Sequence, residues 1–268
     1  RVNGIAVSAD STLTGDLFDK GDVITVLATP WDGIDVGSVL TSTPLTVQST
    51  PPSVVSVLVL PGAPTEASTL VATPLGAVDP DPADTITWGT SWSVNGAPVS
   101  TDATLTGSSF ARSDTITVTL TPSDGEAQGA SVTSPPVVVA NTAPSLADIS
   151  IQPDPAFVDV PFLEAIPGAW SDLDGDAEGY AYAWAVNGTP AATGPFLPQG
   201  FFAKGDLVEV VVTPDDGVSA GGSVSATLDV SNRPPTGATV TVEPATGDET
   251  TVFTALPAGF ADVDGDAE

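Results

Sequence analysis

The feature that most constrains the fold of this chain is an internal repeat of 92 residues. The tripeptide Val-Asn-Gly begins at Val2, Val94 and Val186, which gives two equal steps. Other markers keep the same step, namely Leu13, Leu105 and Leu197, Phe18, Phe110 and Phe202, Asp22, Asp114 and Asp206, and Asp32-Gly33, Asp124-Gly125 and Asp216-Gly217. So many markers in register indicate tandem copies of one folded module.

Proline-rich segments mark the module boundaries, and their composition is that of short, stiff linkers. They lie at Thr50-Pro51-Pro52, Asn141-Thr142-Ala143-Pro144 and Asn232-Arg233-Pro234-Pro235. The predicted organisation is the C-terminal part of a module (1–50), two complete modules (51–142 and 143–233) and the N-terminal part of another (234–268). We therefore expect this chain to be a window of a longer array. Further copies of the module, covalently continued or in a neighbouring chain, would complete the partial ones.

Alternating apolar residues predict β-strands within each module. One set of runs is Ile24/Val26/Ala28, Ile116/Val118/Leu120 and Val208/Val210/Val212, and another is Tyr180/Tyr182/Trp184/Val186 with Trp88/Trp92/Val94 at matching places. The aromatic runs end in Asn-Gly, a preferred hairpin turn, and no window shows a helical period with caps. About seven short strands per repeat predict an all-β fold of tandem immunoglobulin-like β-sandwiches in an end-to-end array.

The composition excludes several classes of function. Five basic and 34 acidic residues give a net charge of −29, which repels nucleic acid and anionic lipid and attracts cations. Cysteine, histidine and methionine are absent, so disulfides, thiol and imidazole catalysis, and most zinc and copper sites are excluded. No apolar run approaches the length of a membrane span, so no membrane insertion is expected in this window. We therefore expect no enzymatic activity.

One motif carries potential chemistry, which is a set of alternate carboxylates on a glycine-turned loop. Its members are Asp172, Asp174 and Asp176, their repeat Asp262, Asp264 and Asp266, and a divergent copy with Asp79, Asp81 and Asp84. Hard oxygen ligands brought to one point are what Ca²⁺ requires, and like charges this close repel one another without a cation. Calcium is therefore the expected cofactor.

The geometry of an immunoglobulin-like sandwich places the acidic loop, the later Asp-Gly turn and the incoming linker at one pole. The expected ligand sets are Asn141, Asp172, Asp174, Asp176 and Asp216 at one junction, and Asn232, Asp262, Asp264 and Asp266 at the next. The first junction is a poorer candidate, because Pro80 and Pro82 restrict its loop and Thr50 replaces the linker asparagine. Two other interpretations stay open: Asp and Gly as turn formers on an acidic surface, or acidity that serves solubility in high salt.

A basic residue precedes the same aspartate in each repeat, in Lys20-Gly21-Asp22, Arg112-Ser113-Asp114 and Lys204-Gly205-Asp206. Two of these segments match an integrin-binding tripeptide. A turn before a strand explains all three, and is the preferred interpretation.

Several patterns follow one another in order along the second complete module: Asn-x-x-Pro, D-x-D-G-D, Tyr-x-Tyr-x-Trp-x-Val-Asn-Gly, Phe-x-Lys-Gly-Asp and Val-x-Val-x-Val-Thr-Pro-x-Asp-Gly. Together they resemble the PKD-like and cadherin-like immunoglobulin repeats of very large bacterial surface proteins. The resemblance implies an extracellular or cell-surface shaft, stalk or filament. Adhesin modules that bind a cell-surface or carbohydrate target, or spacer modules of a secreted hydrolase, are the alternatives. An adhesin would need an exposed aromatic patch, and the sequence reveals none.

Overall fold

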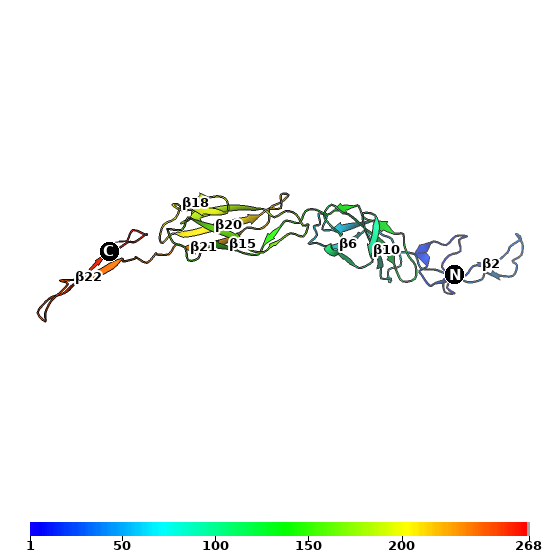
Figure 1. Ribbon diagram of the computed structural model, residues 1–268. Helices are drawn as coiled ribbons and strands as arrows, with labels where there is room; N and C mark the ends of the chain where they lie inside the picture. Colours follow the sequence, from blue (N-terminus) through cyan, green and yellow to red (C-terminus); the bar gives the residue numbers. More distant parts are fainter. Residues whose placement is uncertain (267–268) are drawn as a thin grey trace. The chain divides into compact units, whose positions relative to one another are not determined.

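The computed structural model describes residues 1–266, whose regular elements are β-strands apart from two single-turn 3₁₀ helices, η1 (Gly15–Leu17) and η2 (Gly107–Ser109). The chain forms two compact units, Arg1–Ala140 and a second that begins at Asn141 (Figure 1). Each unit contains one β-sandwich and a shorter flanking segment. Within the described part of the chain, no helix has the length and apolar character needed to cross a membrane.

The sandwich of the first unit consists of two antiparallel sheets. The first has the order β5 (Ser56–Leu60), β6 (Thr69–Leu75), β9 (Thr104–Thr106). The second has the order β11 (Val132–Thr133), β10 (Thr115–Ser123), β7 (Thr87–Val94), β8 (Ala97–Ser100), and β12 (Val137–Val138) also pairs with β10. Burial alternates residue by residue along β10, so one of its faces lies in the core between the sheets.

The sandwich of the second unit repeats this topology. One sheet has the order β14 (Ile149–Gln152), β15 (Phe162–Pro167), β19 (Phe196–Pro198). The other has the order β18 (Thr189–Ala192), β17 (Tyr180–Val186), β20 (Leu207–Pro214), β21 (Val224–Asp229), and β13 (Ser145–Leu146) pairs separately with β16 (Trp170–Ser171). Three strands face four, and alongside the hairpins β14–β15, β17–β18 and β20–β21 the sheets contain pairings between strands that are not consecutive in the chain. This is an immunoglobulin-like sandwich, as the sequence predicted.

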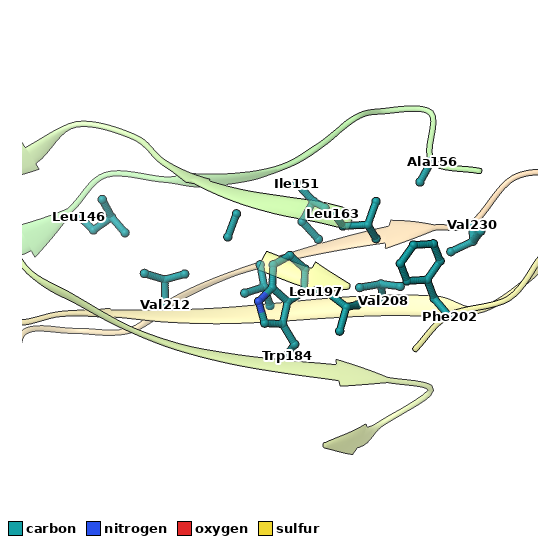
Figure 2. Close-up of a cluster of buried hydrophobic side chains, with 12 residues drawn as sticks. Leu146, Ile151, Ala156, Leu163, Trp184, Leu197, Phe202, Val208, Val212 and Val230 are labelled. Atoms are coloured by element: carbon teal, nitrogen blue, oxygen red, sulfur yellow. The ribbon is translucent and has the colours of Figure 1, made fainter. Parts of the chain in front are cut away.

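A tryptophan lies at the centre of each core. Trp184 is 1% exposed and belongs to a cluster of buried side chains from both sheets, including Leu163 and Val208 (Figure 2). Its Nε1 donates to the carbonyl of Gly194 at 2.9 Å, so the indole is buried with its polar atom satisfied. Trp92 is equally buried in the first unit, and the prediction that these two residues are equivalent is confirmed.

The Asn-Gly turns are fixed by a recurring pair of side chains. Asn187 and Gly188 both have positive φ, which few residues other than Asn and Gly tolerate. The Asn187 amide donates to Asp206 at 2.8 Å and accepts from the backbone of Leu207 at 3.0 Å. The same contacts recur in the pairs Asn3–Asp22 and Asn95–Asp114. The repeated Asn and Asp therefore join the Asn-Gly turn between β17 and β18 to the turn that precedes β20. The turn explanation of the Lys-Gly-Asp segment agrees with this geometry.

The two flanking segments form short antiparallel pairs. In the N-terminal segment, β1 (Val23–Ile24) pairs with β4 (Leu45–Thr46) and β2 (Leu27–Ala28) with β3 (Leu40–Thr41). In the C-terminal segment, β22 (Thr239–Glu243) pairs with β23 (Thr254–Ala258). The expected burial of the run Ile24/Val26/Ala28 is wrong, since Val26 is 60% exposed. Among the described residues no second sheet covers this run, whereas one covers its counterparts in β10 and β20.

An exposed aromatic pair lies on the outer face of the sheet formed by β14, β15 and β19. The rings of Phe162 and Phe196 meet edge to face with their centroids 4.8 Å apart. Both side chains are exposed, because they alternate with the buried Leu163 and Leu197. The sequence did not predict this patch.

Replacing Trp184 by Ala should lower the free energy of unfolding of the second unit by about 3 to 5 kcal/mol, because it leaves a cavity in a fully packed core. Denaturant unfolding of the whole chain followed by circular dichroism measures the change. Trp31→Ala is the matched control, since Trp31 is 70% exposed, and it should shift stability by less than about 0.5 kcal/mol. Equal effects of the two substitutions would contradict the assigned core.

Candidate metal centres

The second acidic cluster, formed by Asp172, Asp176 and Asp216, lies at the pole of the second unit's sandwich. The first two residues belong to the loop between β16 and β17, which Gly175 turns with a φ of +74°. Asp216 follows β20 and is 7% exposed. One carboxylate oxygen from each residue lies within 4.8 Å of the others. Two loops about forty residues apart in the sequence thus present their charges to one point.

The linker that enters this sandwich contacts the same pole. The side-chain amide of Asn141 donates to Asp216 Oδ2 at 2.7 Å and to the Ser219 hydroxyl at 2.8 Å. The backbone N–H of Thr142 donates to Asp174 Oδ2 at 2.7 Å. The linker, the acidic loop and the Asp-Gly turn therefore meet, as the sandwich geometry led us to expect.

The carboxylate of Asp216 is held in its ionised form. Burial by itself raises its pKa, but the hydrogen bonds from Asn141 and from two backbone N–H groups outweigh burial and lower the pKa to about 2. Those N–H groups belong to Val218 and Ser219, and both donate to Oδ1. The pole consequently carries a fixed negative charge at neutral pH.

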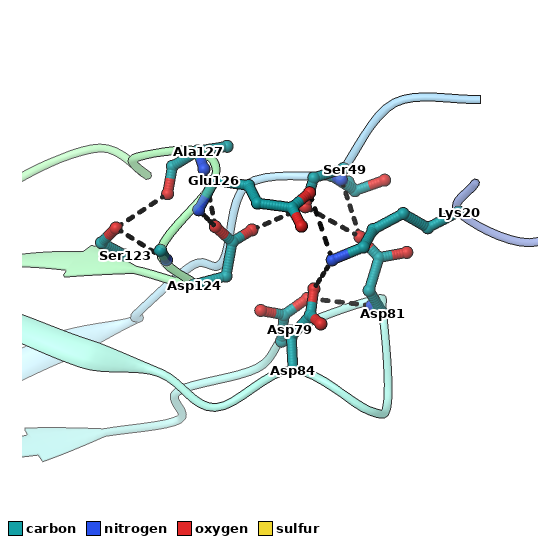
Figure 3. A network of polar contacts seen from close by, with 11 residues as sticks. Lys20, Ser49, Asp79, Asp81, Asp84, Ser123, Asp124, Glu126 and Ala127 are labelled. Carbon is teal, nitrogen blue, oxygen red and sulfur yellow. Dashed lines mark hydrogen bonds and ion pairs between the residues drawn. The ribbon is translucent and has the colours of Figure 1, made fainter. Parts of the chain in front are cut away.

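The first acidic cluster, formed by Asp79, Asp81 and Asp84, consists of residues of one loop (Figure 3). Its contacts with the linker match those of the second unit. The backbone N–H of Thr50 donates to Asp81 Oδ2 at 2.7 Å, just as Thr142 donates to Asp174. The hydroxyl of Ser49 donates to Asp124 Oδ2 at 2.8 Å, just as Asn141 donates to Asp216.

These contacts correct two points of the sequence analysis. Ser49, not Thr50, stands one repeat before Asn141, and its hydroxyl does what the asparagine amide does. Asp124 was missed as a member of the first pole, although it lies one repeat of 92 residues before Asp216 and that step could have found it. Backbone donation from Ala127 and Glu126 lowers the pKa of Asp124, in spite of the opposing effect of burial.

The third acidic cluster, formed by Asp262, Asp264 and Asp266, also has oxygens within 4.8 Å of one another. Its linker contact is the backbone N–H of Arg233, which donates to Asp264 Oδ2 at 2.5 Å. Asn232 does not join the cluster, because its amide donates to the neighbouring carbonyl of Arg233 at 3.3 Å. In the second unit, Asn141 donates to Asp216. Asn232 has no such acceptor, because no described residue of its segment corresponds to Asp216. The last two residues of the acidic motif, 267 and 268, lie outside the described residues.

The first aspartate of every loop has one buried oxygen without a hydrogen-bond partner. These atoms are Oδ2 of Asp79, Asp172 and Asp262. The other oxygen of each accepts from a backbone N–H further along its loop, which fixes the carboxylate. A buried anionic oxygen with no donor is costly, and Asp264 Oδ1 is a further example. Carboxylate oxygens of this kind are ligands that a hard divalent cation prefers.

No protein-family model and no curated protein matches the chain. Among solved structures, the FN1–FN3 domains of chicken CNTN1 are 11% identical and align over 80% of this chain and 77% of theirs, with a TM-score of 0.32. Fibronectin(III)-like modules of Clostridium thermocellum CbhA are 17% identical over 65% of this chain and 94% of theirs, with a TM-score of 0.26. The EC3–6 segment of protocadherin gammaB7 is 16% identical over 88% of this chain and 66% of its own, with a TM-score of 0.25. The fold assignment above rests on the sheet topology and not on these similarities.

Replacing Asn141 by Ala should lower the free energy of unfolding by about 1 to 3 kcal/mol, because the buried Asp216 loses a donor. Denaturant unfolding in the presence of a chelator measures this change. Asn232→Ala removes the same side chain from the corresponding place in the next linker, where it has no cluster contact, and should have little effect. Similar losses of stability in both variants would show that the Asn141–Asp216 contact does not account for the effect on the free energy of unfolding.

Proposed function

We propose that this chain is a non-catalytic repeat region of a secreted or surface-attached bacterial protein, in which calcium binds the acidic pole where each module meets its linker. The observation that carries the proposal is the recurrence of a buried, unpartnered carboxylate oxygen at the same place in three loops. A solvent-facing acidic turn would not bury such an atom three times.

The composition of the poles supports calcium over other metals. The candidate ligands are carboxylate oxygens, and the chain has no His or Cys for softer metals. Ca²⁺ accepts larger and less regular sets of oxygen ligands than Mg²⁺ does, which suits loops that supply acids at alternate positions. With a net charge of −29, the chain also attracts divalent cations from a distance.

The repeat architecture supports a structural role. The same linker contact, a backbone N–H that donates to the middle aspartate of the loop, occurs at Thr50, Thr142 and Arg233. A cation bound by the loop therefore acts on the segment that joins one module to the next. Stiffening of each joint would suit a shaft, stalk or filament outside the cell, built from further copies of the module.

The test is a calcium titration of the whole chain after chelation, by isothermal calorimetry and differential scanning calorimetry. Binding should release measurable heat and raise the melting temperature, since a ligand at a hundred times its Kd stabilises the folded state by about 2.7 kcal/mol. Magnesium at the same concentration should give a smaller shift.

Asp172→Asn should remove one site from the calcium stoichiometry, because Asp172 supplies the unpartnered oxygen of the second cluster. The matched control is Asp229→Asn, which makes the same change of charge on β21, outside the clusters. Absence of heat and of any thermal shift at millimolar calcium would refute the proposed function.

A further inference from the structure

The chain has few basic residues, and most of them recur at one position of the repeat. It has five lysines and arginines in 268 residues, and three of them, Lys20, Arg112 and Lys204, fall at the same position of the 92-residue repeat. The Asn–Asp hairpin contact explains the aspartate two residues later, but it does not use the basic side chain. A separate reason for the charge at this position is therefore required.

The contacts of Lys20 supply such a reason. Lys20 belongs to the N-terminal segment, and its Nζ crosses to the sandwich of the same unit, where it lies 2.5 Å from Asp84 Oδ2 and 3.3 Å from Glu126 Oε2 (Figure 3). Asp84 is the last aspartate of the first acidic cluster. The side chains of Lys20 and Asp84 are only 24% and 16% exposed, so this pair is better shielded from water than an ordinary surface ion pair.

Lys204 makes the corresponding contact in the second unit. It belongs to the sandwich, and its Nζ contacts both carboxylate oxygens of Asp266, the last aspartate of the third cluster. Whichever oxygen Asp266 presents to the cluster, Lys204 already donates to it. The pair is more open than the first, with side chains 33% and 47% exposed.

We propose that Lys20 and Lys204 are tethered cations, each of which reaches across the linker to the acidic loop of the following module and competes there with free divalent cations. In the absence of calcium each holds the loop and the linker together. When calcium binds, the ammonium group and the metal must share or exchange the last aspartate of the loop. The competition rests on the calcium binding proposed above, whereas the tether does not.

The charges predict the direction of the effect on calcium. One positive charge about 5 Å from a divalent ion opposes its binding by about a factor of ten even at the dielectric constant of water. Lys20 therefore lowers the calcium affinity of the first cluster, and Lys204, which is more exposed, lowers that of the third cluster less. The first and third clusters then bind calcium only where its concentration is high.

Amide hydrogen exchange of the whole chain, resolved by mass spectrometry, tests both parts at one loop. In chelator, Lys20→Met should speed exchange of the loop at residues 79–84 and of the adjoining linker by about fivefold, since the ion pair is lost. Lys20→Arg should keep the wild-type rate. The calcium concentration that half-protects the same loop should fall by about tenfold in Lys20→Met.

The control variant is Arg1→Met, which removes the same charge from a residue whose side chain contacts only the Gly4 carbonyl among the described hydrogen bonds. It should leave both readouts unchanged. Unchanged exchange and an unchanged calcium midpoint in Lys20→Met would overturn the proposal, as would a weaker calcium response in that variant. A wild-type chain without any calcium response would remove the competition and the proposed function, while exchange in chelator would still decide the tether.

Discussion

Negative charge gathered at the module poles is the constraint on which the junctions of this protein depend. Each pole brings three carboxylates to within a few ångströms in a chain whose net charge is already −29. Repulsion of that kind opens a loop unless donors hold it closed. The donors are largely backbone N–H groups, some from the loop and one from the linker, so closing the loop also fixes the start of the module.

The sequence predicted the strands and the cores well, because a strand with one buried face has apolar residues at alternate positions. The alternation along Ile116, Val118 and Leu120 is the alternation of a strand with one face in the core, and all three side chains are buried. Trp92 and Trp184 occupy matching sites because the repeat preserves volume at the centre of the sandwich. The same alternation gave a wrong prediction of burial at Val26, because no described sheet covers this strand.

The details of the poles could not be predicted in the same way, because they depend on which donor reaches a carboxylate from a distant segment. A hydroxyl at Ser49 and an amide at Asn141 make the same contact, so residue identity alone pointed to the wrong neighbour, Thr50. Asn232 has the expected identity but bonds to its own linker. Asp84, the partner of Lys20, lies 64 residues further along the chain, and no local sequence pattern predicts this contact.

A tethered ammonium group cannot by itself satisfy all the carboxylate oxygens of a pole. Lys20 and Lys204 are both engaged with the last aspartate of their clusters, yet Oδ2 of the first aspartate, Asp79 or Asp262, remains buried without a donor in those same clusters. An ammonium group has three donors on one stem, and among the described ion pairs the only loop aspartate that Lys20 or Lys204 contacts is the last one. A calcium ion takes about six to eight oxygens from all directions. The ammonium group therefore neutralises charge at the edge of the cluster, and the oxygens at its centre still require a cation that is free to enter between them.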